Sequence, residues 1–588
     1  MGTFVTSTAR CALSFLAAAL IALPAHAAQA LPGSSPAELL ASIMAARHAA
    51  QELAGPGADR QALEQAAARL EQLRRQLDEP PYRDVVLADS FLYAERLNIG
   101  IPLAQIHARL GEKDKALQAL EATTSVVLVP GLAMIAEDPA LASLRREPRF
   151  QAVMATYRQG AIASSKSFAT PFSATLTRRQ RIAGLSHFWS EVRHNFANVD
   201  LMPVLDWDAL YMEYLGKVME AKTTAGYYRV LMQLAPLLQD GHTNIYPPGE
   251  LAALFFARPP VDTELVEDVV VVRAVHDRRL ARSISVGDEI VAVDGVPVKE
   301  YAERFVRPFV SSSTRQDRHV RMYSYQLLAG DAKRPVALTI RDGKGRLRRM
   351  TVARSGAERR AENAFPFHVS DDGIAYLRLD HFESDAGVKA FEQALPEIRR
   401  AKGLILDVRR NGGGSTGHGL RILSYLMDKP VEPMRGRVRF EDQSFRAQAG
   451  DSVSWRPLAA PAHLPGLPAG QRFDGPVAVL IGPKTFSAAE DFAAMYAQAG
   501  RGILVGEATG GSTGQALVLD LPGGGQARIC VKRDTFADGS DFVGKGITPD
   551  YSVRDAIAAV RSGADPVRSE AHRLLLAGAG PQMTRRAK

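Results

Sequence analysis

The sequence predicts a multidomain α/β protein with an N-terminal α-helical region, a β-rich module and an α/β core. Its 588 residues are too many for one hydrophobic core. Residues 34–78 carry apolar side chains at helical spacing, whereas apolar runs separated by turns begin at Val269. Beyond Val352, strand-like and helix-like segments alternate to about residue 556, which is typical of an α/β core.

The first thirty residues differ from the rest of the chain. Arg10 precedes an apolar run at 11–24, and two Ala-x-Ala sequences follow at 25–30. This pattern is typical of a secretory signal peptide. The run is shorter than the about 20 apolar residues that a membrane-spanning helix needs. We therefore expect residues 1–30 to be a signal peptide, and the mature chain to be periplasmic or secreted without stable membrane insertion.

Two helical regions are expected before the β-rich module. The first covers residues 31–170, and its helix-turn-helix pattern at 106–117 resembles a tetratricopeptide hairpin. Such hairpins commonly serve as protein-docking surfaces, so we expect that use of this region. The second is a helical subdomain at 176–258, anchored by bulky aromatic residues.

Charge and cysteine content exclude several functions. The net charge is +8, but basic and acidic residues are interleaved, so we expect no nucleic-acid partner. Segment 259–355 alone holds 18 Lys and Arg against 13 Asp and Glu, which suits an anionic peptide. Cys11 leaves with the signal peptide and Cys530 is then alone, so we expect no intrachain disulfide. No metal cluster and no cofactor motif is expected.

Ser487 is the first candidate for chemistry. A buried strand at 477–481 ends at a Gly-Pro pair, and Ser487 then opens an Ala-rich helix. The free N–H groups of a helix N-terminus can stabilise an oxyanion beside such a hydroxyl. Ser487 and Glu490 also fit a capping box, which requires no catalysis.

A second candidate is the glycine turn at 412–414, which follows a predicted strand at 403–408. Gly412, Gly414 and Gly417 match a dinucleotide fingerprint, but the sequence before them is polar, so we discount this interpretation. Consecutive glycines also let a backbone N–H turn toward a reaction site.

Two further candidates are polar turns. His242 lies in an Asp-Gly-His-Thr turn at 240–243 after an amphipathic helix, where a lone His is often structural. Asp541 lies in a strand-and-turn segment at 538–550, which a simple β-turn also explains.

Taken together, these segments resemble the C-terminal processing (tail-specific) and tricorn-core serine peptidases over residues 176–556. Five landmarks follow the order of that family: Asp-Gly-His-Thr at 240–243, a PDZ-like Gly-Asp-x-Ile to Asp-Gly signature at 287–295, Asp-Val-Arg-x-Asn-Gly-Gly-Gly at 407–414, Thr-x-Ser-Ala-Ala-Glu at 485–490 and Gly-Ile-x-Pro-Asp at 546–550.

The resemblance implies a PDZ-like module at 259–355 and a peptidase core of the ClpP/crotonase-like type at 362–556. The module would bind an extended peptide, although it lacks a Gly-Leu-Gly-Phe-type carboxylate loop. Residues 557–588 are small, polar and basic, and we expect a loose tail there.

The resemblance also implies a division of roles. Some relatives activate the serine with a lysine, but Ser512 stands at that position here, so we expect the tricorn-like use of His242 as general base for Ser487. Related sequences carry a glutamate at the position of Val543. We expect Asp541 to replace it and orient His242, with Glu507 as the alternative acid.

The resulting hypothesis is an exported serine endopeptidase that cleaves peptides or unfolded proteins. Backbone N–H groups of Ala488 and of Gly413 or Gly412 are expected to form the oxyanion hole. An imidazole base predicts activity that rises with pH through about 6 to 7.5. The alternative is a catalytically silent scaffold that binds peptides or lipids, which the missing glutamate at Val543 favours.

Overall fold

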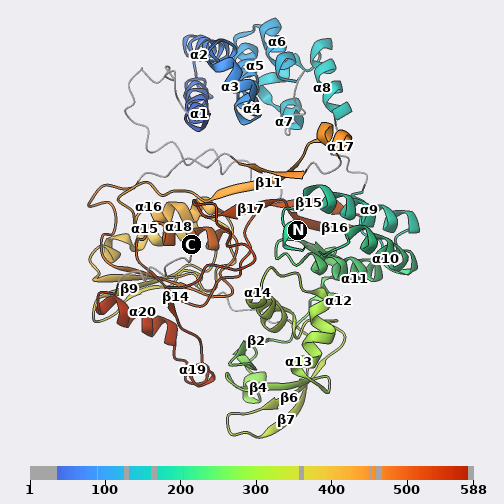
Figure 1. The fold of residues 1–588 in the computed structure, drawn as a ribbon, viewed down its shortest axis with the longest axis vertical. Coiled ribbons are helices and arrows are strands. Elements are labelled where there is room, and N and C mark those ends of the chain that lie inside the picture. The colour runs from blue at the N-terminus through green and yellow to red at the C-terminus, as the bar shows by residue number, and fades with distance from the viewer. Residues whose placement is uncertain are drawn as a thin grey trace. The chain divides into compact units, whose positions relative to one another are not determined.

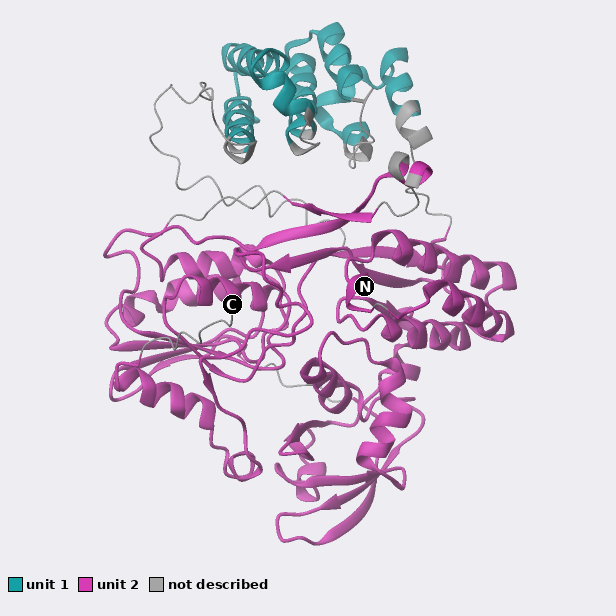
Figure 2. Ribbon diagram, viewed as in Figure 1, with its two compact units in different colours: residues 1–165 teal, residues 166–588 magenta. Residues whose placement is uncertain are grey.

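The structure, a computed structural model, describes residues 36–88, 90–124, 132–160, 168–202, 204–356, 363–449, 453–458 and 466–579. The chain divides into two compact units, residues 1–165 and 166–588 (Figure 2). The predicted signal peptide at 1–30 lies outside the described residues. Among the helices that are described, none is both long enough and apolar enough to span a membrane.

The first unit is helical (Figure 1). Its helices are α1 (Pro36–Leu53), α2 (Arg60–Asp78), α3 (Tyr82–Ala88), α4 (Ser90–Asn98), α5 (Gly100–Leu110), α6 (Lys113–Thr124), α7 (Leu132–Glu137), the short η1 (Pro139–Leu144) and α8 (Pro148–Gly160). The hairpin expected at 106–117 is formed by α5 and α6, which turn at Gly111 with φ 83°. Only glycine adopts that conformation without steric cost.

The second unit begins with the helices α9 (Arg178–Asn195), α10 (Trp207–Glu220) and α11 (Thr224–Leu234). They share one hydrophobic core with a three-stranded sheet of order β1-β16-β15. Its strands are β1 (Asn244–Tyr246), β15 (Ala516–Leu521) and β16 (Gly525–Cys530). The helical subdomain predicted at 176–258 therefore completes its core with a hairpin from much later in the chain, and Cys530 is buried there.

The β-rich module is an antiparallel sheet of order β2-β3-β4-β6-β7, with β5 paired to β4. Its elements are β2 (Val261–Val266), β3 (Val269–Val275), β4 (Glu289–Val293), β5 (Val296–Pro297), α13 (Val298–Tyr301), η7 (Ala302–Val306), η8 (Arg307–Phe309), α14 (Arg315–His319), η9 (Val320–Gln326), β6 (Val336–Arg341) and β7 (Leu347–Val352). Apolar residues from both the strands and the helical segments form its core.

The α/β core contains a six-stranded sheet of order β18-β14-β13-β10-β9-β8, parallel except for the β8–β9 pair. The strands are β8 (Phe367–Val369), β9 (Ile374–Arg378), β10 (Gly403–Asp407), β13 (Val477–Ile481), β14 (Ile503–Gly506) and β18 (Tyr551–Ser552). Strands β10 and β13 are buried at every residue, as expected for parallel strands covered on both faces. The predicted alternation of strands and helices is thus confirmed.

Helices cover both faces of this sheet. The helices α15 (Ala386–Ile398), α16 (Thr416–Ser424) and α18 (Ala488–Gln498) contribute to one apolar cluster, and α20 (Pro566–Leu576) contributes to another. A smaller sheet of order β12-β11-β17 adjoins the core. It consists of β11 (Arg435–Glu441), β12 (Val453–Pro457) and β17 (Lys532–Thr535), with α17 (Gln443–Ala449) between the first two.

The prediction of a loose tail at 557–588 is wrong for residues 557–579. This segment forms α19 (Ile557–Ser562) and α20, and the second helix buries Val567, Ala571, Leu574 and Leu575 against the sheet. The helical spacing of these four residues is visible in the sequence, but the surrounding small and basic residues obscure it. Residues 580–588 lie outside the described part of the chain.

Candidate functional site

Ser487 lies at a strained junction between β13 and α18. Its backbone has φ 56° and ψ −127°, a conformation that residues with a side chain rarely adopt. Its N–H donates to the carbonyl oxygen of Ser512 at 3.1 Å and to Oε2 of Glu490 at 3.3 Å. A sharp strand-to-helix turn of this kind exposes a serine hydroxyl and places it beside free helix N–H groups.

His242 follows the last turn of the helical subdomain and directly precedes β1. The carboxylate of Asp240 accepts hydrogen bonds from the His242 N–H and from the Thr243 hydroxyl, both at 2.9 Å. The ring of Phe486 stacks on the imidazole with centroids 4.8 Å apart. The turn and the stacked ring together hold the imidazole in one orientation.

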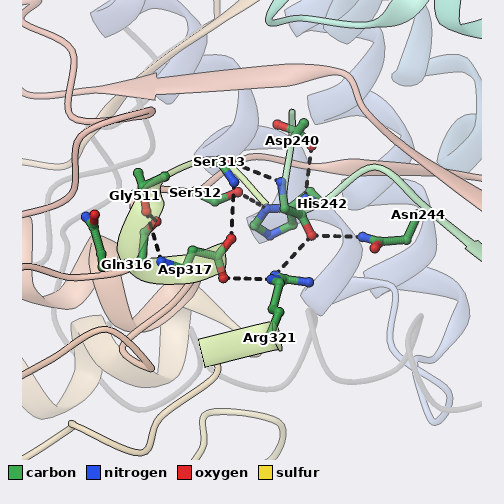
Figure 3. Close-up of polar contacts among 12 residues, drawn as sticks. Asp240, His242, Asn244, Ser313, Gln316, Asp317, Arg321, Gly511 and Ser512 are labelled. Carbon is green, nitrogen blue, oxygen red and sulfur yellow. Dashed lines mark hydrogen bonds and ion pairs between the residues drawn. The ribbon is translucent and has the colours of Figure 1, made fainter. Parts of the chain in front are cut away.

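The fold brings His242 and Ser487 together across 245 positions of sequence. Nε2 of His242 lies 3.0 Å from Oγ of Ser487, within hydrogen-bond distance. Nδ1 lies 2.8 Å from Oγ of Ser512, and Figure 3 shows these two side chains facing each other. For Nε2 to accept a proton from Ser487, Nδ1 must carry the ring hydrogen and donate it to Ser512. Ser512 and Ser487 therefore contact opposite nitrogens of the same imidazole.

The electrostatic surroundings keep His242 neutral. Burial of the imidazole lowers the pKa of His242 to about 4, against the opposing charge of Asp240. The guanidinium of Arg321 lowers it further, and the same group donates to the carbonyl oxygen of Gly241 at 3.2 Å. Arg321 is itself held by Asp317 at 2.6 Å (Figure 3). A neutral imidazole at ordinary pH can accept a proton.

The sequence indicates only a helix-capping role for Glu490, but its contacts in the structure make it a candidate functional residue. It is fully buried, and its Oε1 accepts from the Thr509 hydroxyl at 2.5 Å and from the Gly511 N–H at 2.7 Å. Its Oε2 accepts from the Ser512 N–H at 2.8 Å, besides the contact with Ser487. Burial raises the pKa of Glu490 to about 7, and these donors oppose the rise. One carboxylate thus positions both serines that contact His242.

The glycine turn at 412–414 lies against Ser487. A Cβ on Gly413, whose φ is 103°, would stand 2.7 Å from Cβ of Ser487, so only glycine fits there. The N–H of Gly413 donates to Oδ1 of Asn411 at 2.9 Å and is not available as an oxyanion donor. Within the described residues, the N–H groups of Gly412 and Ala488 have no acceptor. Of the two predicted glycines, Gly412 is thus the one whose N–H has no acceptor among these residues.

Neither predicted acid contacts His242. The carboxylate of Asp541 accepts two hydrogen bonds from Nη2 of Arg437, at 2.9 and 3.0 Å. Asp541 pairs with Thr535 in an isolated β-bridge and is not part of a strand, whereas the side chain of Val543 is buried in the core. Asp541 and Val543 therefore do not share an exposed strand face. Glu507 pairs with Arg554 at 3.3 Å. The assignment of Asp541 as the orienting acid is therefore corrected, and the structure gives Glu507 no contact with His242 either.

A helix of the β-rich module contacts the His242 turn and the loop that carries Ser512. No local sequence pattern predicts these contacts. The hydroxyl of Ser313 accepts from the Gly241 N–H at 2.9 Å. Gln316 donates to the carbonyl oxygen of Thr509 at 2.9 Å, beside the loop that carries Ser512. The segment before and within α14 thus holds the His242 turn and the Ser512 loop together.

Comparison with known proteins gives concordant results. Residues 373–553 match the sequence model of peptidase family S41. The chloroplastic C-terminal processing peptidase of Tetradesmus obliquus is 26% identical over 362 residues, which cover 59% of this chain and 72% of that protein. The carboxyl-terminal-processing protease of Picosynechococcus sp. is 23% identical over 366 residues, or 59% of this chain and 77% of the relative.

Solved structures show the same fold over about two thirds of the chain. Mature CPAF aligns with a TM-score of 0.52 and 15% identity, covering 68% of this chain and 96% of CPAF. Its complex with lactacystin aligns with a TM-score of 0.51 and the same identity, covering 68% of this chain and 98% of CPAF.

Proposed function

We propose that this chain, a serine-type peptidase with a family S41 domain and homologous to C-terminal processing peptidases, cleaves protein substrates with Ser487 as nucleophile and His242 as general base. The observation that carries this proposal is the 3.0 Å contact between Oγ of Ser487 and Nε2 of His242 at a strained strand-to-helix junction. Backbone strain of this kind persists only where the surrounding structure stabilises it, and it is common at active sites.

The proposed reaction follows from this geometry. Oγ of Ser487 attacks the scissile carbonyl carbon while its proton moves to Nε2 of His242. The N–H groups of Ala488 and Gly412 stabilise the negative oxygen of the tetrahedral intermediate. His242 then gives the proton to the leaving amine, and an acyl-enzyme forms on Ser487. Water, deprotonated by the same imidazole, hydrolyses this ester and restores the free serine.

In this proposal Ser512 replaces the carboxylate of a Ser-His-acid triad. Its hydroxyl accepts the Nδ1–H of His242 and selects the tautomer whose Nε2 is free to accept a proton. A hydroxyl carries no charge, so it stabilises an imidazolium less than a carboxylate does. The low pKa of His242, about 4, agrees with a base that lacks a directly bonded anion.

The pH dependence distinguishes this arrangement from an ordinary histidine base. Activity requires neutral His242, so kcat/KM falls as the pH drops through the pKa of the free enzyme. Because burial lowers that pKa to about 4, we expect the acid limb well below pH 6, instead of the range of about 6 to 7.5 that an unperturbed imidazole predicts. The check is a kcat/KM profile from pH 4 to 9 on an uncharged peptide. Burial also raises the pKa of Glu490 to about 7, so an acid limb at or above pH 6.5 would contradict the expected environment of His242 if it persisted in Glu490→Gln.

A fluorophosphonate probe tests whether Ser487 is activated at all. We expect covalent labelling of one tryptic peptide that contains Ser487, and loss of labelling in His242→Ala, since the reagent requires an activated serine. A scaffold without catalysis would not react, and labelling of a different serine would refute the assignment. This experiment therefore separates the peptidase from the silent scaffold, which the comparisons do not favour.

Substrate class and location complete the proposal. The relatives are named for carboxyl-terminal processing, which supports endoproteolytic cleavage of protein chains. We include export to the periplasm or the medium, on the strength of the signal-like residues 1–30. The helices of the first unit are proposed to dock partner proteins.

A further inference from the structure

A groove of about 850 Å³ lies in the second unit, between α11, the link at 254–256 and the helical segment 301–309. We call it the arginine groove. Its lining includes the arginines Arg229, Arg304 and Arg334, together with aromatic side chains at positions 255, 256, 301, 305 and 309. The residues described above as the catalytic site do not line it.

The arginines outnumber the acidic residues that line the groove, and the three exposed arginines form no ion pair with any described residue. Arg229, Arg304 and Arg334 are exposed, and among the described residues no carboxylate lies within ion-pair distance of any of them. The lining aspartates Asp294 and Asp331 accept hydrogen bonds from the backbone N–H groups of Ala337 and Lys333, at 2.8 and 2.9 Å. Three free guanidinium groups around one groove favour an anionic occupant.

Aromatic rings lie beside two of these guanidinium groups. Arg229 lies 5.3 Å from the ring of Phe255 and 5.9 Å from that of Phe309, and Arg304 lies 5.0 Å from Phe305. Phe256 and Phe305 are 42% and 44% exposed. A guanidinium stacked on a ring keeps its N–H edge free for a carboxylate, while exposed rings offer contact to apolar side chains.

The groove is connected to the catalytic turn by a single helical segment. Arg321, within η9, contacts the carbonyl oxygen of Gly241, and Gln326, at the end of η9, lines the groove. The two residues are five positions apart along this helical segment. The groove and the catalytic turn are therefore contacted by the same helical segment.

We propose that the arginine groove binds an internal acidic segment of the protein substrate, with side-chain carboxylates on the arginines and apolar side chains on the phenylalanines. This inference rests on the proposed peptidase function and names the substrate class for it. An internal segment fits because the module lacks a Gly-Leu-Gly-Phe-type loop for a terminal carboxylate. The excess of basic over acidic residues in 259–355, 18 against 13, points to the same chemistry.

The test measures binding to the full chain carrying Ser487→Ala. The ligand is a fluorescein-labelled hexapeptide of alternating Glu and Phe with an amidated C-terminus, followed by fluorescence anisotropy. We expect saturable binding that weakens with added salt and falls about tenfold in Arg304→Gln, the loss typical of one charge-assisted hydrogen bond. Arg349→Gln is the matched control, because Arg349 is exposed on β7 of the same module and does not line the groove. It should bind as the parent does.

Three results would overturn the inference. One is equal affinity in Arg304→Gln and Arg349→Gln. Another is equal affinity for an amidated Gln-Phe hexapeptide with the same label, in which the peptide itself carries no carboxylate. The third is equal affinity for a Gln-Phe hexapeptide with a free C-terminus, which would make the terminal carboxylate the ligand. Hydrolysis of a short uncharged peptide by the unmodified chain is measured in parallel. This assay tests the peptidase proposal by itself, so its failure is distinguished from a failure of the groove to bind acidic peptides.

Discussion

Replacing Ser487 by alanine is expected to lower peptide hydrolysis by about four to six orders of magnitude. The hydroxyl of Ser487 is the proposed attacking group. Among the described residues, no other hydroxyl lies within hydrogen-bond distance of Nε2 of His242. Stability should change by about 1 kcal/mol or less, because the backbone N–H bonds of residue 487 to Ser512 and Glu490 remain. The measurements are kcat/KM on a peptide substrate and the thermal midpoint of the same preparation.

Two further variants make this result specific. His242→Ala should lose a comparable factor, and the double variant should be no worse than either single one, because nucleophile and base act as a unit. Ser562→Ala, at the exposed end of α19, is the matched control and should keep full activity. Undiminished hydrolysis by Ser487→Ala would end the assignment of the nucleophile.

Replacing Ser512 by alanine is expected to lower kcat by about two to three orders of magnitude with little change in KM. Without the hydroxyl, Nδ1 of His242 loses its acceptor, and the imidazole is free to adopt the tautomer that cannot take a proton from Ser487. Loss of a triad orienting group through the wrong tautomer costs up to about four orders of magnitude elsewhere, and a neutral hydroxyl is worth less. Kinetics on one peptide over a range of pH provide the measurement.

The control for this prediction is Asp541→Asn. Its carboxylate faces Arg437 and not the imidazole, so turnover should stay within about twofold of the parent enzyme. Ser512→Thr retains a hydroxyl and should recover part of the rate lost in Ser512→Ala, which a purely structural role does not predict. If Asp541→Asn lost activity and Ser512→Ala did not, the orienting group would be the acid and not the serine.

The sequence by itself determined the order of the elements and indicated the two groups that are proposed to react. Local patterns in the sequence indicate two of these features. Hydrophobic periodicity indicates the alternating strands and helices after residue 352, and capping signals indicate a serine at the start of an Ala-rich helix. His242 was found through the likeness of its turn to a known family, because a single histidine has no local signature of catalysis. The segment at 557–579 was missed because small and basic residues obscure the helical spacing of its apolar positions.

Only the tertiary structure decided which groups meet. The contacts of His242 with Ser487 and Ser512 join positions 245 and 270 residues apart in the chain, and no local pattern encodes them. Asp541 and Glu507 were plausible acids by position, yet each is held by an arginine that folding brings beside it. The sequence indicates that Glu490 caps a helix. Only in the folded chain does its buried carboxylate accept hydrogen bonds from the loop that carries Ser512 as well. Long-range packing, and not local propensity, therefore assembles this active site.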